Sequence, residues 1–338
     1  MTINPVVPTP WTETPLKTSA TLSKLAGCRV LLKLENLQPS GSFKSRGIGN
    51  LVRKAVIAAP PNTPLHFYAS SGGNAGLACV TAATALGYPS TVVVPTLTKP
   101  MMMEKIKTAG EGQTNVMQIG KIWLEADRHL REEILAHDPN GIYVPPFDHP
   151  DIWEGAETLV QEIEEQLEGG LPDAIVACVG GGGLLTGICQ GIAKSPIQQD
   201  NKTLVIAIET AGADSFHASV LAKENTTIPG ITSIATSLGC TRVADEAFKW
   251  SQSQEVNVHS LVVSDKEAVE ACLRFADDER IMVEPACGAT LAAIYSGKLK
   301  EVLELKLNED SQVVLVVCGG SNISLKMLEE YRHIFNIE

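Results

Sequence analysis

A lysine within a glycine- and serine-rich turn is the first candidate for chemistry in this chain. Lys44 lies in the segment QPSGSFKSRG, residues 38–47, directly after Phe43 and just before a stretch compatible with a helix. A lysine on a solvated helix face does not need a glycine- and serine-rich turn before it. An amine that forms covalent bonds needs a sharp turn, little side-chain bulk nearby and shelter from water, which disfavours its charged form. The segment therefore predicts a catalytic lysine, with an ordinary surface lysine as the alternative.

A run of four glycines is the second candidate. The stretch VGGGGLLTG, residues 179–187, follows an apolar run of strand length and opens a segment compatible with a helix. Glycines have no Cβ, so the backbone can turn tightly and direct several N–H groups into one small volume. Together with the positive end of the helix dipole, these groups favour an anion such as a phosphate monoester. The alternative is a tight strand-to-helix turn without a ligand.

The kind of phosphate stays open at this point. Gly181, Gly183 and Gly187 fit a GxGxxxG pattern of the dinucleotide-binding type. Glu209 ends the next predicted strand, where the ribose of a dinucleotide is bound by an acid. A nicotinamide-dependent oxidoreductase is therefore a competing prediction. A P-loop is not, because no Gly-Lys-Ser or Gly-Lys-Thr follows the glycines.

The elements around these residues alternate in a way that is typical of parallel α/β proteins. Short β-branched runs predict strands at 29–35, 65–70, 90–95, 115–120, 173–180, 203–210, 257–264 and 312–320. Amphipathic segments predict helices at 46–58, 74–87, 99–109, 121–137, 153–168, 184–194, 264–277 and 286–297. Because the strands are apolar on both faces, we expect helices on each side of the sheet.

Breaks in this alternation indicate two domains. A proline interrupts the pattern at 38–39, and three prolines interrupt it within YVPPFDHPDIW, residues 143–153. A segment that lies between two breaks indicates one domain inserted into another. We expect a small inserted domain over 38–146 and a large cofactor-binding domain made of 1–37 and 147–338, with a cleft between them.

Composition and charge narrow the classes of partner. The chain of 338 residues has 27 basic and 39 acidic residues, and its formal net charge is -12. A surface of that sign repels nucleic-acid backbones, so a small metabolite is the expected partner. The longest apolar runs are strand-sized and the N-terminus has no apolar signal segment, so we expect no membrane span and a cytoplasmic location. The 8 cysteines lack CxxC spacing and indicate reduced core residues.

Further short motifs occur in order with the lysine turn and the glycine run. They are SSGGNAG at 70–76, SFHAS at 215–219 and CGGSN at 318–322. With PSGSFKSRG and VGGGGLLTG, they resemble the pyridoxal-phosphate enzymes of fold type II (the tryptophan-synthase-β type), and within these the serine/threonine dehydratases. The likeness covers nearly the whole chain, including TSLGC and DDERIMVEPACGA. It implies an α/β fold with two open, mostly parallel twisted sheets flanked by helices, and an active site in the interdomain cleft.

The resemblance also implies which residues hold the cofactor, pyridoxal 5'-phosphate. Lys44 would form the internal aldimine and later act as general base, while Phe43 would pack against the pyridine ring. Asn74 would bind the phenolic oxygen of the cofactor. Its phosphate would be held by the glycine loop, which consists of Gly180, Gly181, Gly182, Gly183 and Leu184.

Substrate binding and ring electronics are implied in the same way. The substrate carboxylate would be held by a helix N-terminus at Ser71, Gly72, Gly73 and Asn74. Cys318 would face the pyridine nitrogen. A thiol does not keep that nitrogen protonated as a carboxylate would, so the ring is a weaker electron sink, which suits elimination and disfavours transamination.

A monovalent cation, with potassium the expected ion, is implied beside the glycine loop. The Glu209 carboxylate and four backbone carbonyls would surround it, since oxygen ligands with one negative charge suit a hard, weakly charged ion. The carbonyls are those of Gly180, Ala213, Leu238 and Cys240. The alternative for Glu209 is an ordinary acid in a solvated loop.

The reaction implied is α,β-elimination of L-serine to pyruvate and ammonia, and of L-threonine to 2-oxobutanoate, by a homodimer. Serine racemase is the nearest rival, but racemases of this type carry a serine acid two residues before the asparagine. Here that position is Gly72, which has no side chain to donate a proton. Other β-elimination or β-replacement enzymes of this fold, and a catalytically inactive binding protein, are further alternatives.

Overall fold

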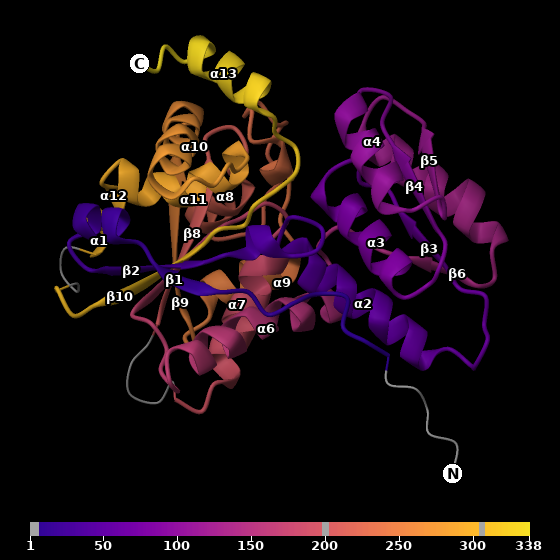
Figure 1. The fold of residues 1–338 in the computed structure, drawn as a ribbon, viewed down its shortest axis with the longest axis horizontal. Coiled ribbons are helices and arrows are strands. Elements are labelled where there is room, and N and C mark those ends of the chain that lie inside the picture. Colours follow the sequence, from indigo (N-terminus) through magenta and orange to yellow (C-terminus); the bar gives the residue numbers. More distant parts are fainter. Residues whose placement is uncertain (1–6, 198–202, 304–307) are drawn as a thin grey trace. The chain divides into compact units, whose positions relative to one another are not determined.

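Two separate sheets organise the chain, one in each of two units (Figure 1). The computed structural model describes residues 7–197, 203–303 and 308–338. The first unit comprises Gln38–Gly155 together with N-terminal residues as far as Thr12. The second unit comprises Glu13–Leu37 and Ala156–Glu338.

The sheet of the first unit is parallel throughout, with the strand order β5-β4-β3-β6. Its strands are His66–Ala69 (β3), Ser90–Val94 (β4), Thr114–Gln118 (β5) and Gly141–Tyr143 (β6). Its helices are Lys44–Ala58 (α2), Asn74–Ala85 (α3), Pro100–Ala109 (α4) and Trp123–His129 (α5). A π-helical turn, Leu130–Ile134 (η2), and a 3-10 turn, Leu135–His137 (η3), continue α5.

Alternation along β3 places helices on both faces of this sheet. Phe67 packs into one core with Ile48 of α2 and Ala78 of α3. The next residue, Tyr68, points to the other face and packs with Ala126 of α5. The strands are therefore buried on both faces, as their apolar sequences predict.

The sheet of the second unit has the strand order β1-β2-β10-β7-β8-β9. Only β1 is antiparallel to its neighbour, and the other strands form a parallel sheet. The strands are Leu16–Thr18 (β1), Arg29–Lys33 (β2), Ala174–Cys178 (β7), Leu204–Thr210 (β8), Asn257–Val263 (β9) and Gln312–Val316 (β10). The strand order differs from the chain order, because β10 lies between β2 and β7.

Helices cover this second sheet on its two faces, with α10 and α11 on one side and α6 and α7 on the other (Figure 1). Both α7 and α11 pack directly on β7 and β8. The helices are Ala20–Ala26 (α1), Pro150–Gln166 (α6), Gly183–Lys194 (α7), Ser215–Ala222 (α8), Asp245–Gln252 (α9), Asp265–Glu279 (α10), Pro285–Tyr295 (α11), Lys298–Leu303 (α12) and Leu325–Ile334 (α13). Two 3-10 turns, Glu35–Leu37 (η1) and Thr236–Leu238 (η4), complete the elements.

The predicted fold class is confirmed. Each predicted strand and helix corresponds to an observed element, and both sheets are mostly parallel and flanked by helices. The predicted helix at 121–137 is shorter than expected, because α5 gives way to the turns η2 and η3. The short strands β1 and β6 and the helices α1, α8, α9, α12 and α13 were not predicted.

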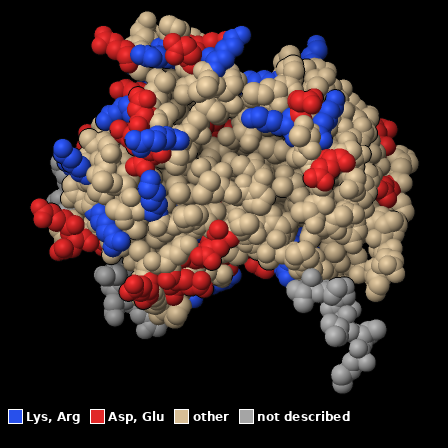
Figure 2. Space-filling model, in the orientation of Figure 1, with Lys and Arg blue, Asp and Glu red and all other residues tan. Residues whose placement is uncertain are grey.

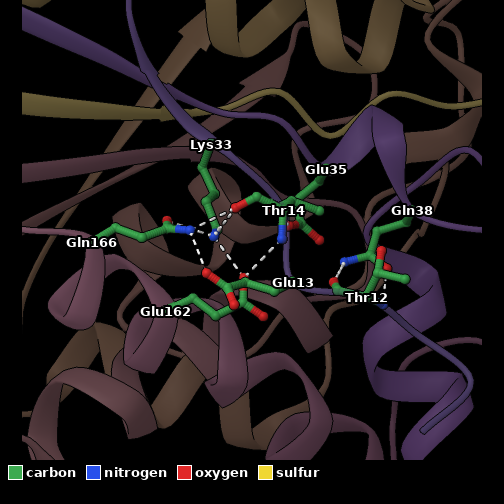
Figure 3. Close-up of polar contacts among 8 residues, drawn as sticks. All are labelled: Thr12, Glu13, Thr14, Lys33, Glu35, Gln38, Glu162 and Gln166. Carbon is green, nitrogen blue, oxygen red and sulfur yellow. Dashed lines mark hydrogen bonds and ion pairs between the residues drawn. The ribbon is translucent and has the colours of Figure 1, made fainter.

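A buried lysine joins β2 to the long helix α6 in the second unit (Figure 3). Lys33 Nζ donates to the Glu162 carboxylate at 2.6 Å and to the Gln166 amide oxygen at 3.0 Å. It also donates to the Thr14 carbonyl oxygen at 2.7 Å. The Thr14 hydroxyl in turn donates to the buried Glu35 carboxylate at 2.6 Å. The lysine side chain is 0% exposed, so protein acceptors take the place of water around its charge.

Removing this lysine should destabilise the second unit. We expect Lys33→Met to lower the free energy of unfolding by about 3–5 kcal/mol, because the Glu162 carboxylate then loses its cation in a largely buried place. Urea unfolding followed by circular dichroism measures the change. Lys249→Met is the matched control, because Lys249 pairs with Glu246 on the surface and should change stability by less than about 1 kcal/mol. Equal effects of the two variants would contradict the prediction.

The charged residues on the surface are mixed in sign, and the cysteines are mostly buried. On the face shown in Figure 2, lysine and arginine side chains are interspersed with aspartate and glutamate, without an extended basic area. Within the described ranges, no helix is both long and apolar enough to cross a membrane. All 8 cysteines are free thiols, and all but Cys240 are buried, which confirms the prediction that they are mainly core residues.

Candidate active site

Lys44 is the first residue of α2, and the turn before it depends on residues of the predicted motif. Gly41 has a φ of 74°, a left-handed conformation that favours glycine. Its N–H donates to the Gln38 carbonyl oxygen at 2.7 Å and closes the turn. The Ser45 hydroxyl donates to the Ser40 hydroxyl at 2.8 Å, which ties the first turn of α2 back to this loop. The sharp turn predicted before Lys44 is confirmed.

The amine of Lys44 is half-buried and close to two groups of the first unit. Nζ donates to the Pro146 carbonyl oxygen at 2.6 Å and lies 5.2 Å from the centroid of the Phe43 ring. Pro146 follows β6 and is 102 residues away in the chain. The sequence predicted a break at this proline pair but gave no sign that its carbonyl meets the lysine.

Residues 71–74 form the turn between β3 and α3. The Ser71 hydroxyl accepts a hydrogen bond from the Gly73 N–H at 3.2 Å. A Cβ on Gly76 would lie 1.8 Å from the Ser71 carbonyl oxygen, so this turn closes onto the helix only with glycine there. Asn74 begins α3, whose first N–H groups have no acceptor within the helix. This N-terminus can therefore bind a carboxylate.

Gly72 lies against a threonine from the loop after β4. A Cβ at this position would be 2.6 Å from Cγ2 and 2.8 Å from Oγ1 of Thr98. A side chain at 72 therefore requires Thr98 to move. Gly72 departs from the racemase pattern, and Thr98 fills the space that a side chain at position 72 would occupy.

The glycine loop joins β7 to α7 in the second unit. Gly182 has a φ of 91°, and a Cβ on it would lie 2.3 Å from Cβ of Ala247 in α9. The Gly181 carbonyl accepts the Ala244 N–H at 3.0 Å. At the start of α7, the N–H groups of Gly183 and Leu184 lie among those that a helix leaves without an internal acceptor. The predicted strand-to-helix turn is confirmed, and it has the backbone donors that an anion needs.

Glu209 lies near the end of β8 and is 0% exposed. Its carboxylate accepts the backbone N–H groups of Phe216 at 2.9 Å and His217 at 2.7 Å, in the first turn of α8. Burial raises the pKa of Glu209 to about 8, although these two hydrogen bonds lower it. A buried carboxylate that binds its own backbone does not suit a dinucleotide ribose, so the structure removes the support that Glu209 gave to that alternative.

The carbonyls predicted to accompany Glu209 come from three segments: Gly180 follows β7, Ala213 follows β8, and Leu238 and Cys240 lie at the end of η4 and just after it. Gly180 is in contact with Leu238, whose carbonyl oxygen would lie 3.5 Å from a Cβ on the glycine. The Cys240 N–H donates to that same carbonyl at 2.7 Å. Ala213 closes the turn after β8 through its N–H, which donates to Thr210 at 2.8 Å.

Cys318 follows β10 and is buried. Its Sγ lies 3.5 Å from that of Cys178, and the pKa of the Cys318 thiol is raised well above its ordinary value by this neighbour and by burial. Gly320 has a φ of 103° and lies against the buried side chain of Glu284. The Glu284 carboxylate accepts the Asn322 N–H at 3.0 Å. Glu284 belongs to the DDERIMVEPACGA motif, but the sequence gave it no role.

Comparison with known proteins places this chain in a family. Residues 7–319 match the family described as "Pyridoxal-phosphate dependent enzyme". The chain is 46% identical over 318 residues to a Bos taurus protein named L-serine dehydratase/L-threonine deaminase, covering 94% of this chain and 93% of that protein. It is 43% identical over 302 residues to an L-serine dehydratase of Saccharomyces cerevisiae (strain AWRI1631), covering 86% and 87% of the two chains.

A solved structure agrees with these sequence relatives. The crystal structure of a fungal L-serine ammonia-lyase from Rhizomucor miehei superposes with a TM-score of 0.87 at 38% identity, covering 96% of this chain and 99% of that one. The resemblance found in the motifs is therefore confirmed across nearly the full length. The chain belongs to the pyridoxal-phosphate dependent enzyme family.

Proposed function

We propose that this chain catalyses α,β-elimination of L-serine to pyruvate and ammonia, and of L-threonine to 2-oxobutanoate. The names of its relatives and their identity over most of both chains support this lyase reaction. The observation that carries the proposal is Lys44, a half-buried lysine at the head of α2 whose amine is held against the Pro146 carbonyl.

The residues present fit pyridoxal phosphate. The phosphate would be bound by the N–H groups of the glycine loop at the start of α7, a tight turn that needs glycine at 182 because a Cβ there would lie 2.3 Å from that of Ala247. When bound, the cofactor supplies an electron-withdrawing ring that acidifies the Cα–H bond of an amino acid. Cys318 would face the ring nitrogen. Its raised pKa keeps the thiol uncharged, so it does not hold that nitrogen protonated as a carboxylate would.

The side chains of the first unit would bind the amino acid and move its proton. The N-terminus of α3 at residues 71–74 would hold the substrate carboxylate, and the Asn74 amide would fix the phenolic oxygen of the cofactor. Lys44 Nζ, once released from its covalent role, would take the α-proton of the substrate as general base. A fixed carboxylate on one side and a fixed amine on the other would orient the Cα–H bond for this transfer.

Pyruvate formation from L-serine is the direct test. Purified protein should be yellow, and borohydride should bleach its visible band and fix the cofactor on Lys44. Pyruvate should then form from L-serine and 2-oxobutanoate from L-threonine, each detected by coupling to a hydroxyacid dehydrogenase. A colourless protein that binds a nicotinamide dinucleotide would refute the proposal.

The same assay separates elimination from racemisation. Chiral chromatography of the reaction mixture measures D-serine beside pyruvate. Because position 72 has no side chain and lies against Thr98, we expect pyruvate to dominate strongly. Faster formation of D-serine than of pyruvate would assign the chain to the racemase alternative.

We further propose a monovalent cation site, with potassium as the ion, at Glu209 and the carbonyls of Gly180, Ala213, Leu238 and Cys240. The contact between Gly180 and Leu238 supports it, as does the buried carboxylate at the end of β8. The ion would brace the glycine loop and take no part in bond breaking. Its single positive charge would offset the negative charge of the desolvated Glu209 carboxylate. A hard cation of this kind binds best to oxygen ligands.

This site predicts a stabilising effect of potassium that grows with pH. Without a cation, folded Glu209 keeps its proton up to about pH 8, whereas the unfolded chain releases it near the ordinary pKa of 4.5. Stability therefore falls as pH rises between these values. Potassium replaces the proton, so potassium chloride should raise the Tm over choline chloride more at pH 9 than at pH 5.

Glu209→Gln should remove this pH-dependent difference, because the amide carries no charge at either pH. Differential scanning fluorimetry of both proteins in the two salts makes the measurement. A potassium-dependent rise in Tm at pH 9 that is as large in Glu209→Gln as in the unchanged protein would exclude Glu209 from the ion site.

A homodimer in the cytoplasm completes the proposal. The homodimer rests on the resemblance to the serine/threonine dehydratases, and the location is supported by the free thiols of all 8 cysteines. The size of the chain, 36.1 kDa, sets the monomer mass. Light scattering of the purified protein should therefore give about twice that mass.

A further inference from the structure

Two thiols lie against one another in the second unit, and the proposed mechanism gives a role to only one of them. Cys178 is the last residue of β7, and Cys318 follows the end of β10. The two strands are paired in parallel through Val176 and Leu315. The two Sγ atoms are 3.5 Å apart although the residues are 140 positions apart in the chain.

The geometry of this pair suits a disulfide. A disulfide bond is about 2.05 Å long, so the sulfur atoms need to approach by only about 1.5 Å. The register of the two strands, continued by two residues, offsets Cys318 from Cys178 by one position. A strand spacing of about 4.8 Å and a rise of about 3.3 Å per residue then give a Cα separation of about 5.8 Å, within the range of about 4.4–6.8 Å that a disulfide spans. Cys318 lies beyond the last residue of β10, where the glycine turn of Gly319 and Gly320 begins. The sulfur can therefore move without breaking the ladder between the strands.

We propose that Cys178 and Cys318 form a reversible disulfide, a redox modification site that switches the lyase off. Hydrogen peroxide is the oxidant. One of the two sulfurs attacks one peroxide oxygen, the O–O bond breaks, and one water molecule leaves while that cysteine becomes a sulfenic acid. The other sulfur then attacks the oxidised sulfur, the S–O bond breaks, and a second water carries away the oxygen and the thiol proton. Two thiols and one peroxide thus give one disulfide and two waters.

The geometry lets either sulfur react first. The two Sγ atoms are 3.5 Å apart, and both residues are buried, with Cys178 6% exposed and Cys318 4% exposed. A sulfenic acid formed on either cysteine therefore has the other thiol as its immediate neighbour, and that thiol resolves it to the disulfide.

Inhibition follows from the position of Cys318, and this part rests on the proposed function. The Cys318 sulfur, which would face the pyridine nitrogen in the reduced enzyme, is drawn toward β7 in the oxidised enzyme. The glycine turn after it cannot follow freely, because Gly320 lies against Glu284. The oxidised site therefore loses the arrangement in which the ring is held.

Peptide mapping of peroxide-treated holoenzyme tests the bond itself. The protein is treated with hydrogen peroxide, free thiols are blocked by alkylation, and the digest is analysed by mass spectrometry without reduction. We expect a cross-linked pair of peptides joined through Cys178 and Cys318 that separates on addition of dithiothreitol. Failure to find this link would overturn the proposal, and so would a link through Cys287, another buried thiol, which lies in α11.

Activity measurements with matched variants test the switch. Pyruvate formation should fall at least about 10-fold on oxidation and return with dithiothreitol, while Cys178→Ala should retain its activity under the same treatment. Cys178→Ser, closer in size to the native residue, repeats the comparison if the alanine variant folds poorly. Cys189→Ala is the control, because this buried thiol of α7 lies outside the pair, and it should respond like the unchanged protein.

The two hypotheses fail in different ways. A reduced protein that forms no pyruvate refutes the proposed function, while the peptide map still decides whether the disulfide forms. A mapped disulfide without loss of activity would refute the switch alone. Reversible inhibition of Cys178→Ala at the rate of the unchanged protein would likewise refute it.

Discussion

Lys44→Ala should reduce pyruvate formation from L-serine by about 10,000-fold or more. The change removes the covalent attachment of the cofactor and the general base in one step, and a positioned base alone contributes up to about 10,000-fold. Initial rates with saturating L-serine and added pyridoxal phosphate measure the loss. Borohydride should no longer fix any label on the protein, which separates a chemical defect from weak binding.

A second lysine of the same helix provides the matched control for this prediction. Lys54 also belongs to α2, but its amine pairs with Asp151 and Glu154. Lys54→Ala should keep the rate within about twofold, because exposed ion pairs contribute little to stability. Near-normal turnover by Lys44→Ala would show that another group performs the proton transfer, and the mechanism would have to be abandoned.

Gly182→Ala should weaken pyridoxal phosphate binding by about 30- to 5000-fold. A left-handed conformation costs a residue with a side chain about 1–2 kcal/mol, and overpacking typically costs about 1–3 kcal/mol more. Both apply here, because Gly182 has a φ of 91° and its Cβ would lie 2.3 Å from that of Ala247. Titration of the apoprotein with the cofactor, followed by absorbance, gives the dissociation constant.

Two further variants divide this effect into its parts. Gly182→Ala combined with Ala247→Gly removes the clash but keeps the unfavourable φ, so it should recover part of the affinity. Gly230→Ala should bind the cofactor normally, because no atom lies within 4 Å of the added Cβ. Unchanged affinity in Gly182→Ala would show that the loop conformation does not hold the phosphate.

The candidate catalytic and cofactor-binding residues could be predicted where their conformation depends on residues next to them in the chain. The turn before Lys44 needs the left-handed Gly41 three residues earlier, and the loop before α7 needs the left-handed Gly182. Such requirements are met by residue types that stand next to each other in the chain. For the same reason, the long parallel strands could be located from their continuous apolar runs.

Contacts between distant segments could not be predicted in this way. Pro146 meets Lys44 and Cys178 meets Cys318 only because of the order in which strands pair. The periodicity of a sequence gives the faces of a strand but not its neighbours. Short strands such as β1 and β6, with 3 residues each, are too brief to show a periodicity at all.

The central place of β10 has a consequence for biosynthesis. The ribosome makes residues 312–316 after all the other strands that the structure describes in this sheet, yet this strand lies between β2 and β7. While a nascent chain still lacks it, the edges of β2 and β7 have no partner between them, and such edges invite aggregation. The sheet of β3 to β6 has all its strands within residues 66–143 and can close much earlier. Insertion of this middle strand is therefore the step at which the second sheet most needs protection by chaperones.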